Sequence, residues 1–281
     1  MPVSAQIIKA DGTKEVFDSG KLMDSLLRAR ARREVAEDIV EKINKEIRDG
    51  MTTSHIYERA FDLLNGKSRK TAMKYSIRRS ILNLGPTGFP FEKYVSEIFK
   101  ARGYETRVGQ IVPGKCIEHE VDMLAWNDKE VIVSEIKFHN ELSAKSDTKV
   151  ALYVKSRFDD LVGQKIRLAG KEREIKRGIL ITNTKFTDNA KQYAECVGTF
   201  EMISWDYPKK DNLFDLIEET QMQPLTAITS LTKKNQQDLL SAGIINCMSL
   251  KDKKHAMKSV GISDHKINEI IENIDNLCVP E

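Results

Sequence analysis

Hydrophobic and polar positions near the middle of the chain predict a β-hairpin. Residues 120–126 and 131–138 are rich in apolar and β-branched side chains, and the polar segment 127–130 between them supplies a turn. This arrangement places Asp122 directly opposite Glu135 on one face, where opposed Cβ atoms lie about 4.5–5.5 Å apart. Both faces otherwise carry apolar side chains, which predicts a strand pair buried between helices.

The two carboxylates of this hairpin indicate a metal site. Lys137 lies two residues after Glu135 and therefore faces the same side of the strand. Carboxylates this close repel each other unless a positive charge lies between them, and hard oxygen ligands suit Mg²⁺ or Mn²⁺. The same residues also fit an ordinary charged cluster at a strand end, in which Lys137 pairs only with Glu120.

A third acid favours the metal site. Apolar residues at helical spacing predict a helix over 88–103, with Pro90 in its first turn and Gly103 at its end. Glu92 lies on the flank of the apolar stripe, one turn from the helix start, where it can reach the same metal. The sequence thus predicts one acidic centre built from a helix and two strands.

The order of these residues resembles the restriction-endonuclease-like nucleases of the PD-(D/E)xK superfamily, in particular their Mrr-like branch. In that family a helix glutamate precedes a strand aspartate, and Glu-x-Lys follows on the next strand. Here these positions are Glu92, Asp122, Glu135 and Lys137. The proline that names the motif is absent, since Val121 precedes the aspartate. The resemblance covers roughly the middle half of the chain.

This resemblance implies an Mg²⁺-dependent endodeoxyribonuclease with DNA as its substrate. Asp122, Glu135 and the backbone carbonyl of Ile136 would hold the metal. Glu92 would complete the site directly or through water. Lys137 would orient or activate the attacking water and offset the charge of the transition state.

The rest of the central segment predicts a mixed sheet between helices. A strand, a helix and a further strand follow one another at the spacing of a βαβ unit. The pattern predicts strands at 104–108, 177–183 and 200–205, a loop at 109–115, and helices at 147–162 and from Thr187.

Charged residues outside the acid cluster are less specific. The stretch 145–177 is basic and would suit DNA phosphates, although its interspersed acids equally fit a solvated face. His119 and His139 flank the acids. Lone histidines are weak evidence for a metal site, so we expect both to be polar residues at its rim.

The N-terminal segment predicts a small strand hairpin followed by helices. Asp18 or Ser19 is expected to cap the first helix. The predicted elements are strands at 6–9 and 14–17 and helices from about 19, over 34–48, from 52–54 and over 69–83, the last of them strongly basic.

This order resembles the ATP-cone, a nucleotide-sensing domain of ribonucleotide reductase large subunits and of some regulators. The matching stretches are 8–15, Lys21 and 51–56. The resemblance implies that ATP or dATP binds here as a regulatory ligand. Lys9, Lys21 and Thr53 would contact its phosphates, and Glu15 and Ile56 would lie near its base and sugar. The alternative is a small helical interaction domain with solvated lysines. No glycine-rich P-loop is present in the sequence, so we expect no Walker-type ATP hydrolysis.

The C-terminal segment predicts a compact helical bundle. Gly243 and Gly261 each follow one predicted helix and precede another, which resembles a tandem helix-hairpin-helix module that grips the DNA backbone. Small helical bundles also contain such turns, so a protein-contact module is the alternative. Nearby lysines between 251 and 258 favour the DNA-binding hypothesis.

Composition sets the frame for these segments. With 281 residues the chain is long enough for several domains, expected at 1–84, 85–220 and 221–281, and its net charge of +3 does not by itself indicate nucleic acid. The cysteines lack CxxC spacing and are expected to be reduced core thiols. With no apolar signal or spanning segment, the expected location is the cytoplasm, without membrane contact.

The sequence therefore predicts an α/β protein with a helical ATP-cone, a mixed-sheet α/β/α restriction-endonuclease-like core and a small all-α C-terminal domain. We expect a metal-dependent DNA endonuclease regulated by ATP or dATP, acting in defence against foreign DNA or in repair. A homo-oligomer, dimer or tetramer, is expected. The alternatives are a nucleotide-responsive DNA-binding regulator that does not cleave, and a junction-specific resolvase.

Overall fold

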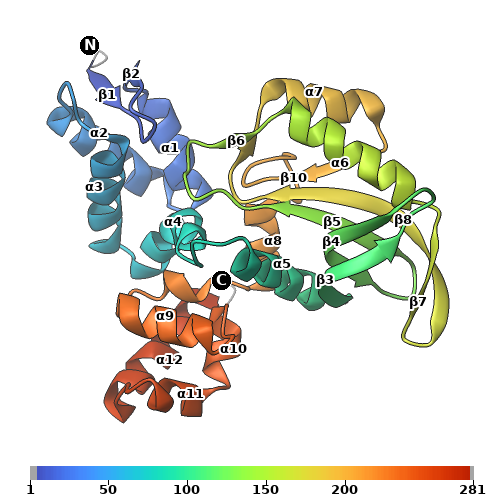
Figure 1. Ribbon diagram of the computed structural model, residues 1–281. Helices are drawn as coiled ribbons and strands as arrows, with labels where there is room; N and C mark the ends of the chain where they lie inside the picture. The colour runs from blue at the N-terminus through green and yellow to red at the C-terminus, as the bar shows by residue number, and fades with distance from the viewer. Residues whose placement is uncertain (1–4, 279–281) are drawn as a thin grey trace.

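The computed structural model describes the backbone of residues 5–278 and side chains as far as residue 275. The chain forms an N-terminal helical unit, a central α/β unit and a C-terminal helical unit (Figure 1). This is the fold class that the sequence patterns predicted.

The N-terminal unit begins with an antiparallel strand hairpin and continues as helices. Asp18 accepts hydrogen bonds from two backbone N–H groups at the start of the first helix, and Thr52 caps the third helix. The helices therefore begin close to the predicted residues. The elements are β1 (Gln6–Ile8), β2 (Lys14–Val16), α1 (Ser19–Arg28), α2 (Arg33–Glu46), α3 (Thr53–Asn65) and α4 (Arg69–Leu82).

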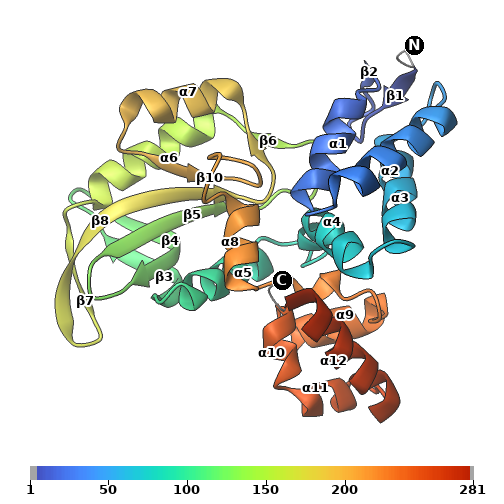
Figure 2. The same cartoon turned by 180° about the vertical axis from the view of Figure 1, so that it is seen from behind.

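Helix α4 is the junction of the three units. Its sequence is basic, but apolar side chains between the charges are buried around most of the helix. Ala72 and Tyr75 join the N-terminal core, Met73 joins the C-terminal core, and Ile77 and Ile81 join a core of the central unit. Figures 1 and 2 both show α4 where the three units meet.

The central unit is a mixed sheet covered by helices on both faces. The strand order is β10-β8-β5-β4-β3, with β7 on β8; β3, β4 and β5 pair antiparallel, whereas β5, β8 and β10 pair parallel. Helices α5 and α8 lie on one face and α6 and α7 on the other (Figure 1). The elements are α5 (Phe89–Ala101), β3 (Glu105–Pro113), β4 (Glu118–Trp126), β5 (Val131–Lys137), β6 (Lys145–Ser146), α6 (Thr148–Leu161), β7 (Lys165–Leu168), β8 (Lys171–Thr182), β9 (Lys185–Phe186), α7 (Asp188–Val197), β10 (Glu201–Ile203) and α8 (Leu213–Thr220).

The predicted hairpin register is confirmed. Leu124 pairs with Val133 and Trp126 with Val131, so the strands continue toward Asp122 and Glu135 in the expected alignment. The register follows from the two-residue period of the side chains, because a slip by one residue would turn every apolar side chain to the wrong face.

The strand pair β3–β4 bends at the acidic residue. Gly109 lies opposite Asp122, between two regular ladder pairs, with φ of +59°. Glycine adopts this left-handed backbone without the steric cost that a Cβ imposes. On one side of the bend Met123 packs in the core under α5, whereas Val121 packs with α6. On a straight strand, residues two apart such as these would lie on one face.

Two stretches that were not predicted to be strands are strands. The segment 109–115 was expected to be a loop, but β3 continues through the bend to Pro113. Residues 165–177 form the hairpin β7–β8, and many of their charges are paired. Lys165 pairs with Glu172 at 3.0 Å, for example. The interspersed acids of this hairpin therefore pair with its bases, and contact of the basic stretch 145–177 with DNA stays a prediction.

The cysteines differ in their burial. Cys247 is buried as expected, but Cys116 and Cys196 are exposed, so the expectation of core thiols was wrong for these two. The side chain of Cys278 lies outside the described residues.

The C-terminal unit packs short helices around its own apolar core. Gly243 and Gly261 have φ of +79° and +81° and allow tight turns between successive helices. None of the helices in the described part of the chain has the length and apolarity that a membrane crossing requires. The elements are η1 (Leu225–Ala227), α9 (Lys233–Ser241), α10 (Cys247–Lys251), α11 (Lys254–Ser259) and α12 (Asp264–Cys278).

Candidate active site

The start of helix α5 directs Glu92 toward the end of strand β5. A Cβ added at Gly88 would lie 3.4 Å from Oε1 of Glu92 and 3.7 Å from Cβ of Phe138, so the Glu92 side chain folds back over the helix start toward Phe138. The rings of Phe91 and Phe138 lie 5.6 Å apart and fix the helix against the strand end. Glu92 is thereby held beside the acidic hairpin.

The two strand acids lie where the β4–β5 ladder ends. Glu135 is only 5% exposed, and its Oε1 accepts a hydrogen bond from Nζ of Lys137 at 2.5 Å. Oδ2 of Asp122 accepts from the backbone N–H of Ile136 at 2.5 Å. The pairing of Lys137 with Glu135, rather than with Glu120 alone, places its charge inside the acid cluster.

The environment of these acids is strongly negative. Burial, and then the charges of Asp122, Glu120 and Glu135, raise the pKa of Glu92 to about 7. Burial and the charge of Glu135 also raise the pKa of Asp122, against the opposing effect of its hydrogen bond from Ile136. The structure therefore brings Glu92, Asp122, Glu135 and Lys137 into one electrostatic site.

Arg157 of helix α6 belongs to this site and was missed from the sequence. Its Nη1 donates to Oε2 of Glu135, and its Nη2 donates to the backbone carbonyl of Glu120. The sequence contained a signal: Arg157 lies on the buried stripe of its helix, seven residues after Val150. A charged residue on an apolar stripe needs a buried partner.

The side-chain hydrogen bonds of the two histidines go to residues outside the acid cluster. His119 was expected at the rim, but it is 9% exposed and its Nε2 lies 2.8 Å from Oδ2 of Asp160. Nε2 of His139 lies 3.0 Å from the hydroxyl of Ser146. Burial, followed by the charge of Lys137, lowers the pKa of His139, so it is neutral at physiological pH.

The donor chemistry of the site fits a hard divalent cation. In the described part of the chain, no group of three or more His, Cys, Asp or Glu side chains is arranged as a metal site. The donors predicted from the sequence are the carboxylates of Asp122 and Glu135 and the carbonyl of Ile136, which are hard oxygen ligands. Burial is the main cause of the raised pKa of Glu92 and of Asp122, and a cation there would relieve the carboxylate repulsion that adds to it.

A second site lies in the N-terminal unit. All five residues expected to contact a nucleotide line one cavity of about 710 Å³, a size within the range of small-molecule sites of about 300–1,000 Å³. Nζ of Lys9 lies 2.6 Å and Nζ of Lys21 lies 3.5 Å from the same carboxylate oxygen of Glu15. Thr53, at the first turn of α3, and Ile56 complete this side of the cavity.

One relative aligns with this chain over most of the relative's length. An uncharacterized protein of Archaeoglobus fulgidus is 31% identical over 178 residues, which are 63% of this chain and 95% of the relative. Residues 224–278 match a family described as AF1548-like, C-terminal. The chain belongs to the AF1548-like family.

One solved structure agrees with this assignment. The crystal structure of AF1548, a protein of unknown function, is similar with a TM-score of 0.52 and 30% identity, over 68% of this chain and 98% of that chain. A repair endonuclease from Pyrococcus abyssi gives a TM-score of 0.30 at 19% identity, over 42% of this chain and 46% of that chain. The latter likeness is too low to support a conclusion.

Two further family matches define the remaining domains of this AF1548-like protein. Residues 5–83 match the ATP cone domain, and residues 86–209 match the Mrr_cat family, described as restriction endonuclease. The predicted ATP-cone and Mrr-like nuclease domain are therefore confirmed as family assignments. The helix-hairpin-helix likeness of the C-terminal unit stays a prediction.

Proposed function

We propose that this protein is a metal-dependent DNA endonuclease whose activity is regulated by ATP or dATP bound in the cone. The observation that carries the proposal is the convergence of Glu92, Asp122 and Glu135, with Lys137, on one edge of a restriction-endonuclease-type domain. The raised pKa of Glu92, about 7, supports a site built to hold charge.

The metal ligands in this proposal are Asp122, Glu135 and the carbonyl of Ile136. A divalent cation bound there supplies Lewis-acid polarisation of the phosphate and lowers the pKa of water. Arg157 fixes the orientation of the Glu135 carboxylate from the side opposite Lys137. The ammonium of Lys137 is free to exchange its carboxylate partner for a phosphoryl oxygen, where it offsets developing negative charge.

Glu92 is the proposed acceptor of the proton from the attacking water. Burial is the largest cause of the raised pKa of Glu92, and it persists when a cation neutralises the neighbouring carboxylates, so Glu92 stays a stronger base than an exposed glutamate. One such site cuts one strand. A second copy, as in the expected homo-oligomer, would let both strands of a duplex be cut in one encounter.

The decisive experiment is cleavage of supercoiled plasmid in Mg²⁺, with and without ATP or dATP. We expect nicking or linearisation by the wild type and a loss of at least about 100-fold in Glu135→Gln, because the substitution removes a metal ligand and the partner of two cations. Glu118→Gln is the matched control, since Glu118 is an exposed glutamate at the start of the same hairpin's first strand.

A filter-binding assay separates cleavage from DNA binding. Glu135→Gln should still bind the plasmid, because positively charged surfaces rather than this carboxylate hold DNA. DNA binding by a wild type that cuts under no condition would instead support the non-cleaving regulator. Equal cleavage by wild type and Glu135→Gln would overturn the proposed metal site.

A further inference from the structure

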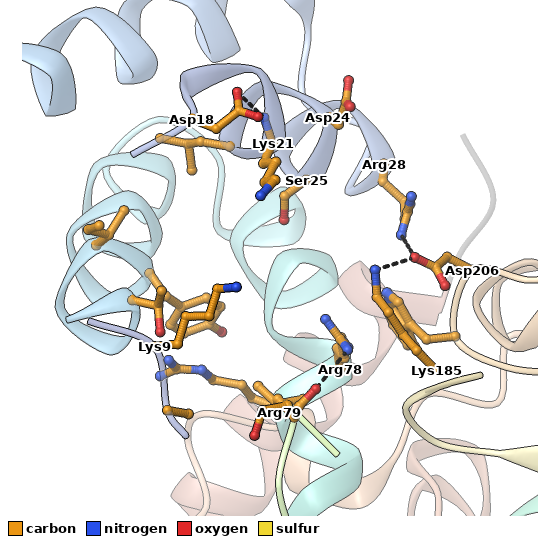
Figure 3. Close-up of a pocket in the computed structure, with 18 of the residues that line it drawn as sticks. Lys9, Asp18, Lys21, Asp24, Ser25, Arg28, Arg78, Arg79, Lys185 and Asp206 are labelled. Carbon is orange, nitrogen blue, oxygen red and sulfur yellow. Dashed lines mark hydrogen bonds and ion pairs between the residues drawn. The ribbon is translucent and has the colours of Figure 1, made fainter. Parts of the chain in front are cut away.

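The nucleotide cavity is enclosed from two sides. One wall is the cone, and the other belongs to the nuclease domain, through Leu142, Ser143, Lys145, Lys185 and Asp206. Eight basic and five acidic residues line it, so the cavity has an excess of positive charge. Figure 3 shows Lys9 and Lys21 on the cone side and Lys185 and Asp206 across the cavity.

Two lysines of the nuclease domain lie side by side in this wall. β6 and β9 pair parallel, and Lys145 is the direct partner of Lys185 in the register. Like charges directly opposite each other on neighbouring strands are unfavourable without a counter-ion. Lys145 forms no ion pair within the part of the chain that the structure describes.

The carboxylate of Asp206 forms ion pairs with two cations at this end of the cavity. Oδ2 of Asp206 lies 2.8 Å from Nζ of Lys185 and 3.7 Å from Nη1 of Arg28 at the end of α1 (Figure 3). Burial alone would raise the pKa of Asp206, but the hydrogen bond from Lys185 and the charges of both basic neighbours lower it. Asp206 therefore stays ionised and bridges the cone to the nuclease domain.

Arg78 of α4 adds an incompletely satisfied charge between the two walls. Its Nη2 donates to the carbonyl of Leu142 at 3.3 Å, which is a neutral acceptor, and its Nε is buried without a hydrogen-bond partner. Burial lowers the pKa of Arg78. A buried guanidinium of this kind is stabilised by an anion with several oxygens.

Short segments lead from this wall to the candidate active site. Lys145 follows Lys137 by eight residues, and Lys185 follows the end of β8 by three. The two segments are tied together: the N–H of His139 donates to Oδ1 of Asn183 at 2.8 Å, and Nδ2 of Asn183 donates to the carbonyl of His139 at 2.8 Å. A shift of one segment is therefore passed to the other.

We propose that the nucleotide site is shared between the two domains. Lys145, Lys185 and Arg78 hold the terminal phosphates, while the cone, through Lys9, Lys21 and Thr53, holds the phosphate nearest the sugar and has the base and sugar against it. This inference rests on the proposed nucleotide binding and adds the nuclease domain as its second half. A polyphosphate competes with Asp206 for Lys185 and neutralises Lys145. Occupancy thereby fixes the segment 138–146, whose first residue follows Lys137 directly.

Calorimetric titration of the full-length protein with ATP and with AMP tests the shared site. The double variant Lys145→Ala/Lys185→Ala should bind ATP at least about tenfold more weakly, because each lysine supplies a charge-assisted contact to phosphate. The loss should be smaller for AMP, which lacks the β- and γ-phosphates. Lys129→Ala/Lys171→Ala is the charge-matched control, since both lysines are exposed and outside the cavity.

Lys21→Ala separates failure of this inference from failure of nucleotide binding as such. Weaker binding in Lys21→Ala with unchanged affinity in the Lys145/Lys185 variant would confine the site to the cone and overturn the shared site. Absence of ATP binding by the wild type would overturn both proposals. Lys145→Ala alone is also measured, since it should fold normally. Its side chain is exposed and forms no ion pair within the described part of the chain.

Hydrogen exchange provides the readout of the link between the domains. ATP should lower deuterium uptake of segment 138–146 in the wild type and in the Lys129/Lys171 control, but not in the Lys145/Lys185 variant. Protection restricted to the cone in all proteins would contradict a site that includes the nuclease domain.

Discussion

Glu92 illustrates how a single residue can be stabilised in an unusual protonation state by its neighbours. Its carboxyl is partly buried, and the carboxylates of Asp122, Glu120 and Glu135 lie near it. Both disfavour the ionised form. The same features make the residue suited to accept a proton near neutral pH.

The pKa of Glu92 predicts a pH-dependent effect on stability. The fold raises this pKa from 4.5 to about 7, so the folded state binds the proton more tightly than the unfolded state does. The free energy of unfolding therefore falls as pH rises from about 4.5 through about 7. Glu92→Gln removes this loss and should be more stable than wild type by about 1–3 kcal/mol at pH 8, but by little at pH 5.

Urea unfolding without divalent metal at the two pH values measures this difference. Glu97→Gln, a partly exposed position on the same helix that pairs with Lys100, is the control and should show no comparable dependence. A stability difference of Glu92→Gln that is equal at pH 5 and pH 8 would contradict the raised pKa.

At the scale of elements, the contact between α6 and β8 positions Arg157. Phe158 packs directly over Gly178, and a Cβ at Gly178 would lie only 2.2 Å from Cδ2 of its ring. The glycine therefore sets the distance between the helix and the sheet. Arg157, the preceding residue, reaches Glu135 from a helix held at that distance.

Gly178→Ala should accordingly affect both stability and cleavage. The added methyl pushes α6 from the sheet at a cost of about 1–3 kcal/mol, and cleavage should fall because Arg157 moves from Glu135. Phe158→Leu in the same chain should restore part of both, since the smaller side chain makes room. Chemical denaturation of the two single variants and the double variant measures the coupling, and strictly additive effects would refute this contact.

At the scale of the whole molecule, α4 joins three cores. Its side chains pack into the cone, the nuclease domain and the C-terminal unit, while Arg78 and Arg79 line the nucleotide cavity. The hydroxyl of Thr226 also donates to the carbonyl of Ser80 at 2.5 Å, which ties the C-terminal unit to the same helix. A change in the packing of any one of these cores therefore alters the contacts of α4.

Ile77→Ala should therefore lower the stability of the molecule as one unit. Ile77 is fully buried, and loss of its side chain leaves a cavity that costs about 2–4 kcal/mol. Calorimetry should show a single transition shifted to lower temperature. Separate transitions, of which only one moves, would show that α4 does not couple the domains. Val16→Ala, at an exposed apolar position of the cone, is the control and should leave the transition in place.

Local patterns were sufficient for much of the fold. Helix starts followed from cap residues such as Asp18 and Thr187, whose side chains satisfy backbone N–H groups within the same turn. The Asp122–Glu135 alignment followed from a short turn and a two-residue period. The bend at Gly109 was not predictable from local patterns. It turns Val121 toward helix α6, and that contact joins segments far apart in the chain.

The sequence by itself determined the identity and order of the acidic residues, the hairpin that aligns them and the cone residues expected at a nucleotide. These depend on neighbours within a few positions of the chain. Only the tertiary structure decided that Arg157 joins Glu135, that α4 enters three cores and that Lys145 and Lys185 face the nucleotide cavity. Such contacts join distant segments, and the packing free energy of the whole molecule, rather than a local pattern, selects them.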